Sequence, residues 1–472
     1  MDKESLLRQV RKDEVVFVQL WFSDIHGNLK RKTIMADELA EALERGSWFD
    51  GSSIEGFTRI QESDAQLLPD PTTYQLIPWA RVKDEETGRI KRGARIFCDV
   101  LRPDGQSFEG DPRYILKRAL AKAKRMGFIY NTSPEVEFFL FKQRGQCLAP
   151  LDRAGYFDAT GDLAHGFRDS VVARLDKMGI VVEMTHHEVS PGQYEIGIKY
   201  SDALSMADNV MTVKHVIERT ARDKYKWLAV FMPKPIANIN GSGMHTHQSL
   251  FRAGDNAFCD MRDRNAYHLS EIARQFIAGQ IAHVKALSAI MAPTVNSYKR
   301  LVPGYEAPTY ICWGGMNRAA LIRVPAYTSE KPKSVRCELR ASDPLCNPYL
   351  AFAAMLAAGL DGIEKGFSCP KPTEGDVFKL SPEELESRGI GQLPGSLKEA
   401  LDYLEQDDVI LNALGGHTAK WFLDAKKKEC EEYEEACGGD TGTYSMQVTG
   451  WEIRKYLFGG YREEDLTIRI PK

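Results

Sequence analysis

Two glutamates flank a turn signal within the range Thr185–Tyr200. Pro191 and Gly192 are typical turn residues, and the β-branched and aromatic residues on either side favour strands. A hairpin with its tip at these two residues would place Glu188 and Glu195 directly opposite one another, because both are equally far from the tip. Like charges at such positions repel unless a cation lies between them. A divalent metal ion is the natural cation, and two solvated glutamates on a hairpin face are the alternative.

Two further pairs of polar side chains have the i, i+2 spacing that places both members on one face of a strand. Glu135 and Glu137 lie in the apolar stretch Phe128–Phe141, where glutamates are rarely buried without a partner. His245 and His247 follow a short glycine-rich segment that allows a ligand to approach the backbone closely. A single histidine is usually structural, but two beside such a segment equally suit a ligand role.

Arginines flank a glutamate in the segment RCELRASDP. On a strand Arg336, Glu338 and Arg340 all point to one side, and Arg318 and Arg323 lie close together upstream. Two forked cations around one carboxylate suit a phosphate or carboxylate that binds beside a metal ion. A ladder of structural salt bridges is the alternative.

Six side chains in these segments are candidate metal ligands: Glu135, Glu137, Glu188, Glu195, His245 and Glu338. Five carboxylates and one imidazole exceed the needs of one ion, and they fit two Mg²⁺ or Mn²⁺ ions that keep some waters and bind substrate phosphates. The sequence has no Walker A motif, G-x-G-x-x-G loop, G-x-S-x-G elbow or H-E-x-x-H motif. These observations together favour phosphoryl transfer by two metal ions and an arginine cluster.

The elements that must position these residues fall into two parts. Residues 1 to about 105 are strand-rich, with a helix near Ala36–Arg45. A boundary rich in proline and glycine follows at Arg102–Pro112, and a helix is predicted to begin there with Asp111 as N-cap and to end before Gly127. Beyond the Glu135 strand the periodicity predicts long helices over the ranges Ser201–Trp227, Ser270–Ala292 and Ala351–Gly366, with further helical spacing from 381 to 433.

Composition excludes several classes of protein. The chain of 472 residues is 43% hydrophobic and 27% charged with a net charge of −4, so nothing indicates a nucleic-acid partner. No run approaches the roughly 20 apolar residues of a membrane span. The N-terminus is too charged for a signal peptide, and the nine cysteines are scattered without a C-x-x-C pair. Both features predict a cytoplasmic protein with reduced thiols.

Seven segments, in this order, resemble the signature blocks of the glutamine synthetase family: DGSSIEGF, SPEVEFF, HHEVSPGQYEI, KPIANINGSGMHTHQS, NSYKRLVPGYEAP, NRAALIRVP and RCELRASDPLCNPYL. Length and block order are similar to those of the prokaryotic type I enzymes. The resemblance implies an α+β fold, with a small N-terminal β-grasp-like domain (1–105) and a large catalytic domain (106–472) whose curved antiparallel sheet is flanked by helices. It further implies a glutamate–ammonia ligase that makes glutamine from glutamate, ammonia and ATP through γ-glutamyl phosphate.

The resemblance also implies a role for each matching residue. Glu137, Glu188 and Glu195 match the ligands of one Mg²⁺ or Mn²⁺ ion, and Glu135, His245 and Glu338 those of the ion on the ATP phosphates. The glutamate site matches Asn240, Gly241, Arg300 and Arg340. Arg318 and Arg323 match arginines that face phosphate, and the nucleotide contacts match Glu183, Tyr200, His247, Ser249, Lys333 and Arg336.

Two acidic residues of the family's site match positions in loops. Asp50, with Ser53 near it, matches the ammonium site and is the expected base, while Glu306 matches the glutamate of a flap that closes the site. In the family the domain that carries this aspartate completes the active site of a neighbouring subunit. The resemblance therefore implies a homo-oligomer, a dodecamer of two stacked hexamers.

Regulation is expected to follow the non-adenylylated, alpha-like subclass. Phe378 stands where the adenylylated subclass has a modified tyrosine, and Arg59 matches an arginine that takes part in feedback inhibition by glutamine. An insertion at 436–443 and an added tail at 462–472 bear on inter-ring contacts and on any small regulatory protein. Two alternatives to glutamine synthesis stay open: a γ-glutamyl ligase for a larger amine such as a polyamine or ethanolamine, and an inactive homologue.

Overall fold

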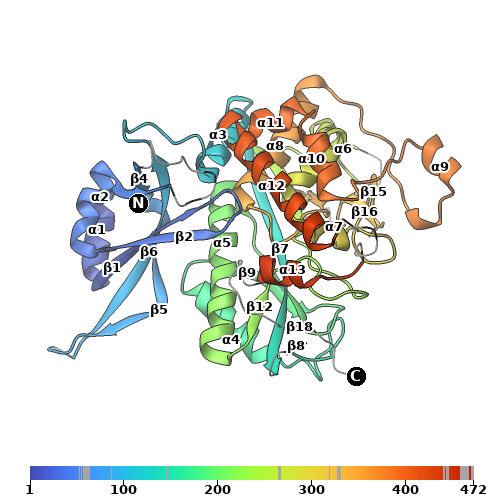
Figure 1. The fold of residues 1–472 in the computed structure, drawn as a ribbon. Coiled ribbons are helices and arrows are strands. Elements are labelled where there is room, and N and C mark those ends of the chain that lie inside the picture. Colours follow the sequence, from blue (N-terminus) through green and yellow to red (C-terminus); the bar gives the residue numbers. More distant parts are fainter. Residues whose placement is uncertain are drawn as a thin grey trace.

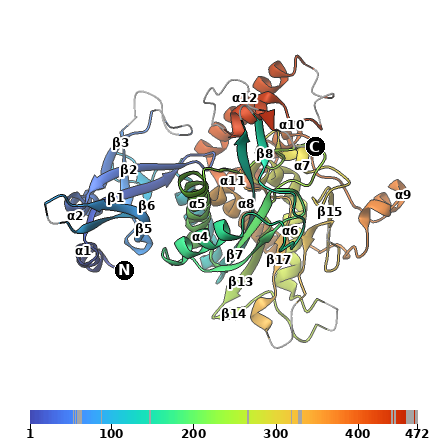
Figure 2. The same ribbon diagram turned by 90° about the horizontal axis from the view of Figure 1, so that it is seen from below.

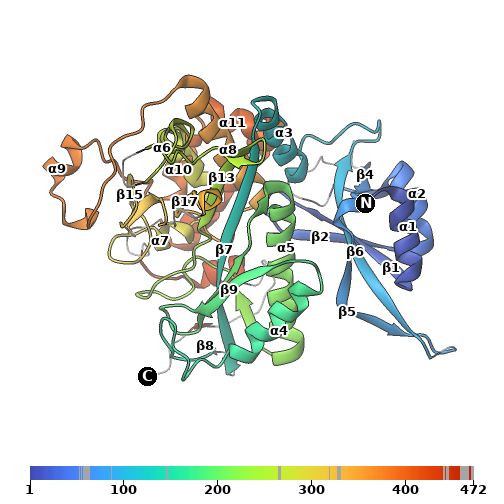
Figure 3. The same cartoon turned by 180° about the vertical axis from the view of Figure 1, so that it is seen from behind.

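The computed structural model describes residues 1–52, 54, 56, 64–86, 88–144, 147–263, 267–317, 319–326, 331–439, 442, 446–457 and 467–468. Figures 1 and 3 show two parts side by side, a small N-terminal sheet with its helices and a larger sheet surrounded by helices. Among the described residues, no helix combines the length and the apolar character needed to cross a membrane.

The described part of the N-terminal sheet has the strand order β2-β1-β6-β4-β3, with β5 paired to β6. Its strands are β1 (Val15–Ser23), β2 (Leu29–Met35), β3 (Ser47–Asp50), β4 (Asp64–Pro69), β5 (Gln75–Lys83) and β6 (Ile90–Leu101). The central pair β1 and β6 is parallel, whereas the other pairs are antiparallel. Short helices cover it: α1 (Lys3–Lys12), η1 (Ala36–Glu38), α2 (Leu39–Arg45) and η2 (Pro71–Thr73). The predicted strand-rich segment with one helix near Ala36–Arg45 is thus confirmed, and α1 is an additional helix that was not predicted.

A buried arginine joins the two parts. Helix α3 (Pro112–Arg125) begins as predicted, with the Asp111 side chain accepting a hydrogen bond from the Arg113 backbone N–H. The Arg113 guanidinium pairs with Asp70 and Asp99 of the first part, and with Asp208 of the second, at N–O distances of 2.8, 2.7 and 3.1 Å. Because the arginine is 3% exposed, this network fixes the start of the catalytic part against the first sheet.

The larger sheet runs β15-β16-β17-β13-β7-β10-β9, with short strands attached at its sides. Its strands are β7 (Ile129–Arg144), β8 (Cys147–Pro150), β9 (Val182–His187), β10 (Gln193–Ile198), β11 (Ser201–Asp202), β12 (Leu228–Val230), β13 (Thr246–Arg252), β14 (Asp255–Asn256), β15 (Tyr310–Gly314), β16 (Ala320–Arg323), β17 (Cys337–Leu339) and β18 (Thr467–Ile468). The pairs β15/β16 and β8/β18 are parallel, so the sheet is mixed rather than wholly antiparallel. The central strands β9, β10, β7, β13 and β17 are antiparallel as expected.

Helices form the second layer of the catalytic part. They are α3, α4 (His165–Asp176), α5 (Ala203–Thr220), which continues as the π-helical turn η3 (Ala221–Tyr225), α6 (Glu271–Met291), α7 (Ser297–Arg300), η4 (Pro332–Ser334), α8 (Pro348–Lys365), η5 (Val377–Lys379), α9 (Pro382–Ser387), α10 (Leu397–Leu404), α11 (Asp408–Leu414), α12 (Gly416–Ala436), α13 (Gly450–Glu452) and η6 (Ile453–Leu457). The long helices predicted from periodicity are α5, α6 and α8. Helix α8 is buried over most of its length, and it forms one hydrophobic core together with α6 and the inner face of the sheet.

Candidate active site

The candidate metal ligands lie on neighbouring strands of the larger sheet. Strand β7 carries Glu135 and Glu137, and it lies between β10 and β13. In register, Glu195 of β10 lies opposite Glu137, and Glu338 of β17 lies opposite His247 of β13. The i, i+2 spacing of the sequence therefore brings the predicted side chains to one region of the sheet surface.

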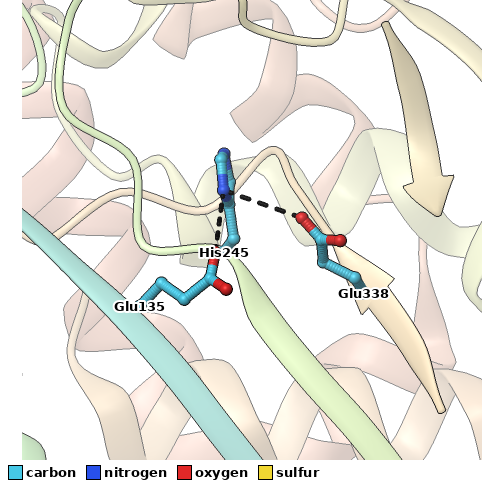
Figure 4. A group of neighbouring side chains, drawn as sticks. All are labelled: Glu135, His245 and Glu338. Carbon is cyan, nitrogen blue, oxygen red and sulfur yellow. Dashed lines mark hydrogen bonds and ion pairs between the residues drawn. The ribbon is translucent and has the colours of Figure 1, made fainter. Parts of the chain in front are cut away.

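Glu135, His245 and Glu338 form the first ligand group. One ligand atom of each lies within 4.8 Å of the others. The Nδ1 atom of His245 is 3.3 Å from a Glu135 oxygen and 3.7 Å from a Glu338 oxygen, and Figure 4 shows it directed between the two carboxylates. Their convergence from β7, from β17 and from the residue before β13 is the geometry of a metal site.

Basic side chains surround the first ligand group. The Arg340 Nε lies 3.1 Å and the Arg323 Nη1 3.2 Å from oxygens of Glu338. His247 Nε2 lies 2.9 Å from Glu135. Burial alone would raise the pKa of Glu135, but hydrogen bonds from the two histidines outweigh it and hold the pKa well below its usual value. Burial is likewise outweighed at Glu338, whose pKa is lowered by the charges on the histidines and on Arg340.

His186, Glu188, Glu195 and the neighbouring Glu137 form the second ligand group. The two ring nitrogens of His186 each lie 3.8 Å from a carboxylate oxygen, one on Glu188 and the other on Glu195. One ligand atom of each of these three residues lies within 4.8 Å of the other two. Glu137 reaches back toward the first group, with an oxygen 3.9 Å from His245 Nδ1.

The predicted hairpin register is wrong, although the two glutamates still converge. Glu195 lies opposite His186 rather than Glu188, and the Glu188 N–H donates to the Gln193 carbonyl. A turn with Gly192 at φ +68° closes through a bond from the Gln193 N–H to the Ser190 carbonyl. A Pro-Gly turn of this kind does not match strand twist, so two extra residues lie on the first arm and shift the register. Glu188 and Glu195 are consequently diagonal neighbours.

Carboxylates repel one another in the second ligand group. Burial, with the Glu188 charge adding to it, raises the pKa of Glu137 to about 8. Burial is also the main cause that raises the pKa of Glu188, and it raises that of Glu195 well above its usual value, with the surrounding glutamates contributing. Burial lowers the pKa of His186, which keeps the ring neutral and able to coordinate a metal ion.

The residues of both groups fit divalent metal ions. Hard cations prefer carboxylate oxygens with an imidazole as a further ligand. Within the described part of the chain, Glu195 Oε1 and His186 Nδ1 are buried and have no hydrogen-bond partner. Such atoms are rare in folded proteins, and a bound ion would satisfy both.

Two cavities adjoin the ligand groups. The larger, of about 300 Å³, is lined by six predicted nucleotide contacts and a ligand of the first group: Glu183, Tyr200, His247, Ser249, Lys333, Arg336 and Glu135. The smaller, of about 50 Å³, is lined by the predicted glutamate contacts, the flap glutamate and three ligand residues: Asn240, Gly241, Arg300, Arg340, Glu306, Glu137, Glu188 and His245. The ligand groups thus lie between two cavities of different size and charge.

Two buried arginines and a glycine loop form one wall of the smaller cavity. The Arg300 guanidinium donates to the backbone carbonyls of Arg340, Ala341 and Ser342. A side chain at Gly243 would place its Cβ 2.4 Å from that guanidinium, so only glycine allows the arginine to pass. Among the described residues, Arg340 Nη1 is buried and has no hydrogen-bond partner, which leaves it free for an anion.

Comparisons with known proteins agree with this geometry. Residues 14–103 match the family model "Glutamine synthetase, beta-Grasp domain", and residues 109–456 match "Glutamine synthetase, catalytic domain". The chain belongs to the glutamine synthetase family. Curated glutamine synthetases from Thermotoga maritima and Thermus thermophilus are 45% and 46% identical over 97% and 96% of this chain, and over 100% and 98% of their own. A solved GmaS/ADP complex is 31% identical with a TM-score of 0.80, over 96% of this chain and 99% of its own.

Several residues predicted from the family resemblance are not part of this cluster. Asp50 ends strand β3, which Figure 2 places in the N-terminal part, apart from β7, β13 and β17. Arg323 reaches the first ligand group through Glu338 but lines neither cavity. The predictions for Arg318, Arg59 and Ser53, and most of those for the 436–443 insertion and the tail, lie outside the described residues.

The structure adds residues to the site that the sequence prediction missed. His186 joins the second ligand group, and the rings of Tyr156 and Phe157 pack edge-on against it at centroid distances of 5.4 and 4.6 Å. Gln193 donates to Glu137 at 2.9 Å and to the Gly241 carbonyl at 3.0 Å. The adjacent histidines before Glu188 could have indicated His186, but nothing in the local sequence indicated Gln193.

Proposed function

We propose that this enzyme ligates ammonia to L-glutamate with ATP, giving L-glutamine, ADP and phosphate through γ-glutamyl phosphate. The observation that carries the proposal is the position of two metal-ligand groups between two cavities. Glu135 lines the larger cavity, whereas Glu137 and His245 line the smaller one. A phosphoryl group passing from a nucleotide to an amino acid would cross the ligand groups, where its charge is stabilised.

The larger cavity suits ATP. Lys333 and Arg336 supply positive charge for phosphates, and Tyr200, which is 52% exposed, offers a ring face at the cavity wall. The solved neighbour at 31% identity is a complex with ADP, which supports an adenine nucleotide as a ligand of this chain. We assign Glu183, His247 and Ser249 to the same ligand.

The smaller cavity suits glutamate. Its buried Arg300 and Arg340 would hold carboxylates, and Asn240 and Gly241 supply backbone and amide groups beside them. We propose that Glu137, Glu188 and Glu195 hold one Mg²⁺ or Mn²⁺ ion and that Glu135, His245 and Glu338 hold another. Such ions supply charge neutralisation for the phosphates and fix the position of the reacting carboxylate.

The remaining roles concern closure of the site, proton transfer from ammonium and contact with the transferred phosphate. Glu306 lines the smaller cavity from an exposed loop, where a flap would exclude water from the acyl phosphate. Asp50 would attract ammonium and accept its proton, and Arg318 and Arg323 would face the transferred phosphate. Because Asp50 lies in the other part of its own chain, we propose that it serves the site of a neighbouring subunit in a dodecamer of two stacked hexamers.

Turnover with different amines tests this function. Purified protein with Mg²⁺, ATP and glutamate is expected to form glutamine with ammonium faster than it forms products with ethanolamine or putrescine. Faster turnover on an organic amine would show that this amine, rather than ammonia, is the substrate. An absence of ATP turnover with every amine, with effectors tested, would identify an inactive homologue.

The role of Asp50 has a test of its own. Asp50→Ala is expected to abolish ammonium-dependent turnover while ATP binding persists. Asp64→Ala is the matched control, because Asp64 lies directly opposite on β4 and has no assigned role. Equal loss of turnover and of ATP binding in Asp50→Ala would show that Asp50 is structural.

A further inference from the structure

A fully buried lysine lies beside the smaller cavity and belongs to neither ligand group. Lys234 is 1% exposed. Within the described part of the chain no carboxylate forms an ion pair with it; its ammonium donates to the Ile239 carbonyl, and its Nζ lies 3.7 Å from the centroid of the Tyr305 ring. A buried charge without an anionic partner is costly, so its retention calls for an explanation.

The lysine backbone is held firmly in place. The Lys234 N–H donates to the Asn296 side-chain oxygen at 2.7 Å, and the Asn296 amide donates back to the Lys234 carbonyl at 2.9 Å. The same amide donates to Glu452 at 2.7 Å. The start of the lysine side chain is therefore fixed, and burial limits the space that its ammonium can reach.

The two partners of the ammonium belong to the two loops that enclose the smaller cavity. Ile239 immediately precedes Asn240 and Gly241, which line one wall. Tyr305 lies in the loop from 301 to 308 and lines the cavity together with Glu306. Burial, together with the Arg300 charge, lowers the pKa of Lys234 to about 8, so the amine is still mostly charged at neutral pH.

We propose that Lys234 is a positioning residue that latches the 301–308 loop over the smaller cavity through the face of the Tyr305 ring. A desolvated ammonium attracts an aromatic face strongly, and the bond to the Ile239 carbonyl ties the same cation to the segment that continues into Asn240 and Gly241. The latch thus joins the loop that carries Glu306 to the loop that would hold glutamate.

The latch has a chemical consequence that rests on the proposed function. When the loop opens before ammonia reacts, a water oxygen can bond to the δ-carbon of γ-glutamyl phosphate. The carbon–oxygen bond to phosphate then breaks, one water proton goes to the departing phosphate and the other to solvent, and glutamate and inorganic phosphate leave. ATP is consumed in this leak without glutamine being formed, so the ratio of phosphate released to glutamine formed reports how well the latch holds.

The test uses two substitutions that remove the contact between Lys234 and Tyr305. Two controls accompany them: one keeps this contact, and the other removes a similar contact elsewhere in the protein. Lys234→Met removes the charge, and Tyr305→Leu removes the ring, while Tyr305→Phe keeps the ring face. Lys285→Met is a control for losing a lysine–tyrosine contact, because Lys285 Nζ lies 4.5 Å from the Tyr403 ring centroid between α6 and α10. The readouts are backbone hydrogen exchange of residues 301–308 without substrate and the phosphate-to-glutamine ratio during turnover.

We expect exchange in the loop to rise by about tenfold in Lys234→Met and Tyr305→Leu, as loss of a desolvated cation–π contact implies. Their phosphate-to-glutamine ratio should rise well above one, while Tyr305→Phe and Lys285→Met stay within about twofold of the wild-type ratio. Wild-type exchange and a ratio of one in Tyr305→Leu would overturn the latch, and this variant decides even where Lys234→Met does not fold. The latch would also be overturned if hydrogen exchange of the loop rose as much in Tyr305→Phe as in Tyr305→Leu. Failure of the wild type to form glutamine would overturn the proposed function instead, and hydrogen exchange would still decide the latch.

Discussion

The first ligand group is surrounded by basic side chains, whereas the second consists almost entirely of acids. Around Glu135 and Glu338 lie His247, Arg323 and Arg340, all within 3.2 Å of a carboxylate oxygen. No arginine or lysine forms an ion pair with Glu188 or Glu195 among the described residues, and the nearest base is the neutral His186. The two groups share ligand types but differ in how their charge is balanced.

This difference shows in opposite pKa shifts on residues of similar burial. Glu135 and Glu338 have lowered pKa values because their interactions with the two histidines, and with Arg340 in the case of Glu338, outweigh burial. Glu137, Glu188 and Glu195 have raised values, since burial and mutual repulsion act in the same direction. The first group is therefore stable as it stands, and its arginines can also bind phosphate. The second group needs a cation to complete it.

The largest effect we expect is on turnover, and it should be similar for the two groups. Glu195→Gln and Glu338→Gln each remove a proposed metal ligand, and metal stabilisation of transition-state charge is worth several kcal/mol. We expect glutamine formation at millimolar Mg²⁺ to fall by roughly 10³-fold in both. Glu364→Gln, the same change in the exposed ion pair with Lys122, is the control and should retain activity. A loss below tenfold at either ligand would contradict the assignment of that group.

The two substitutions should change the stability of the metal-free protein in opposite directions. Glu338→Gln leaves the buried Arg340 guanidinium without its carboxylate, and breaking a buried pair costs about 3–5 kcal/mol. Glu195→Gln instead removes a buried carboxyl whose pKa is raised well above its usual value, so a small gain is expected. Thermal melts in EDTA check both signs. A loss of stability in both variants would show that the second group is not strained by like charge.

Metal binding should stabilise the protein mainly through the second ligand group. A ligand that binds the folded state at 100 times its Kd stabilises by about 2.7 kcal/mol, and we expect Mg²⁺ to raise the melting temperature of the wild type accordingly. In Glu195→Gln most of this increase should disappear, while in Glu338→Gln part of it should remain. If Mg²⁺ raised the melting temperature of Glu195→Gln as much as that of the wild type, the more tightly bound ion would not lie at the second ligand group.

The sequence could predict which residues meet, because strand spacing alone determines which side chains share a face. Glu135 with Glu137 and His245 with His247 follow from the i, i+2 rule. The helix predicted to begin after Asp111 and to end before Gly127 is α3 in the structure. The hairpin register could not be predicted in this way. It depended on Gly192 at φ +68° and on two extra residues in the first arm, which strand periodicity does not encode.

Features that depend on distant parts of the chain also escaped prediction. Lys234 lies between two prolines, and no local pattern indicates that it is 1% exposed beneath a loop some 70 positions away. The charge balance of the ligand groups is another example, since it depends on which strand neighbours β17 in the sheet. Asp50 lies in the N-terminal part, and its proposed role in the site of a second chain follows only from the family resemblance.

The smallest expected effect is a pH dependence that separates the two groups. The folded-state pKa of Glu137 is about 8, above its ordinary value of 4.5, so the folded protein binds this proton more tightly than the unfolded chain does. Its contribution to stability is present below about pH 4.5 and is lost as the pH rises through 8. Glu338 has a lowered pKa, so its contribution is lost only as the pH falls through that lowered value.

Melting temperatures of Glu137→Gln and Glu338→Gln in EDTA from pH 5 to pH 8 test this contrast. Glu137→Gln cannot ionise, so its melting temperature relative to the wild type should increase by a few degrees across this range. The deficit of Glu338→Gln should stay constant, because Glu338 is ionised throughout the range. With excess Mg²⁺ the advantage of Glu137→Gln should reverse, since the bound ion favours the charged carboxylate. If the melting temperatures of the two variants, relative to the wild type, changed with pH in the same way, the basic side chains around the first group would not give it a different charge balance from the second.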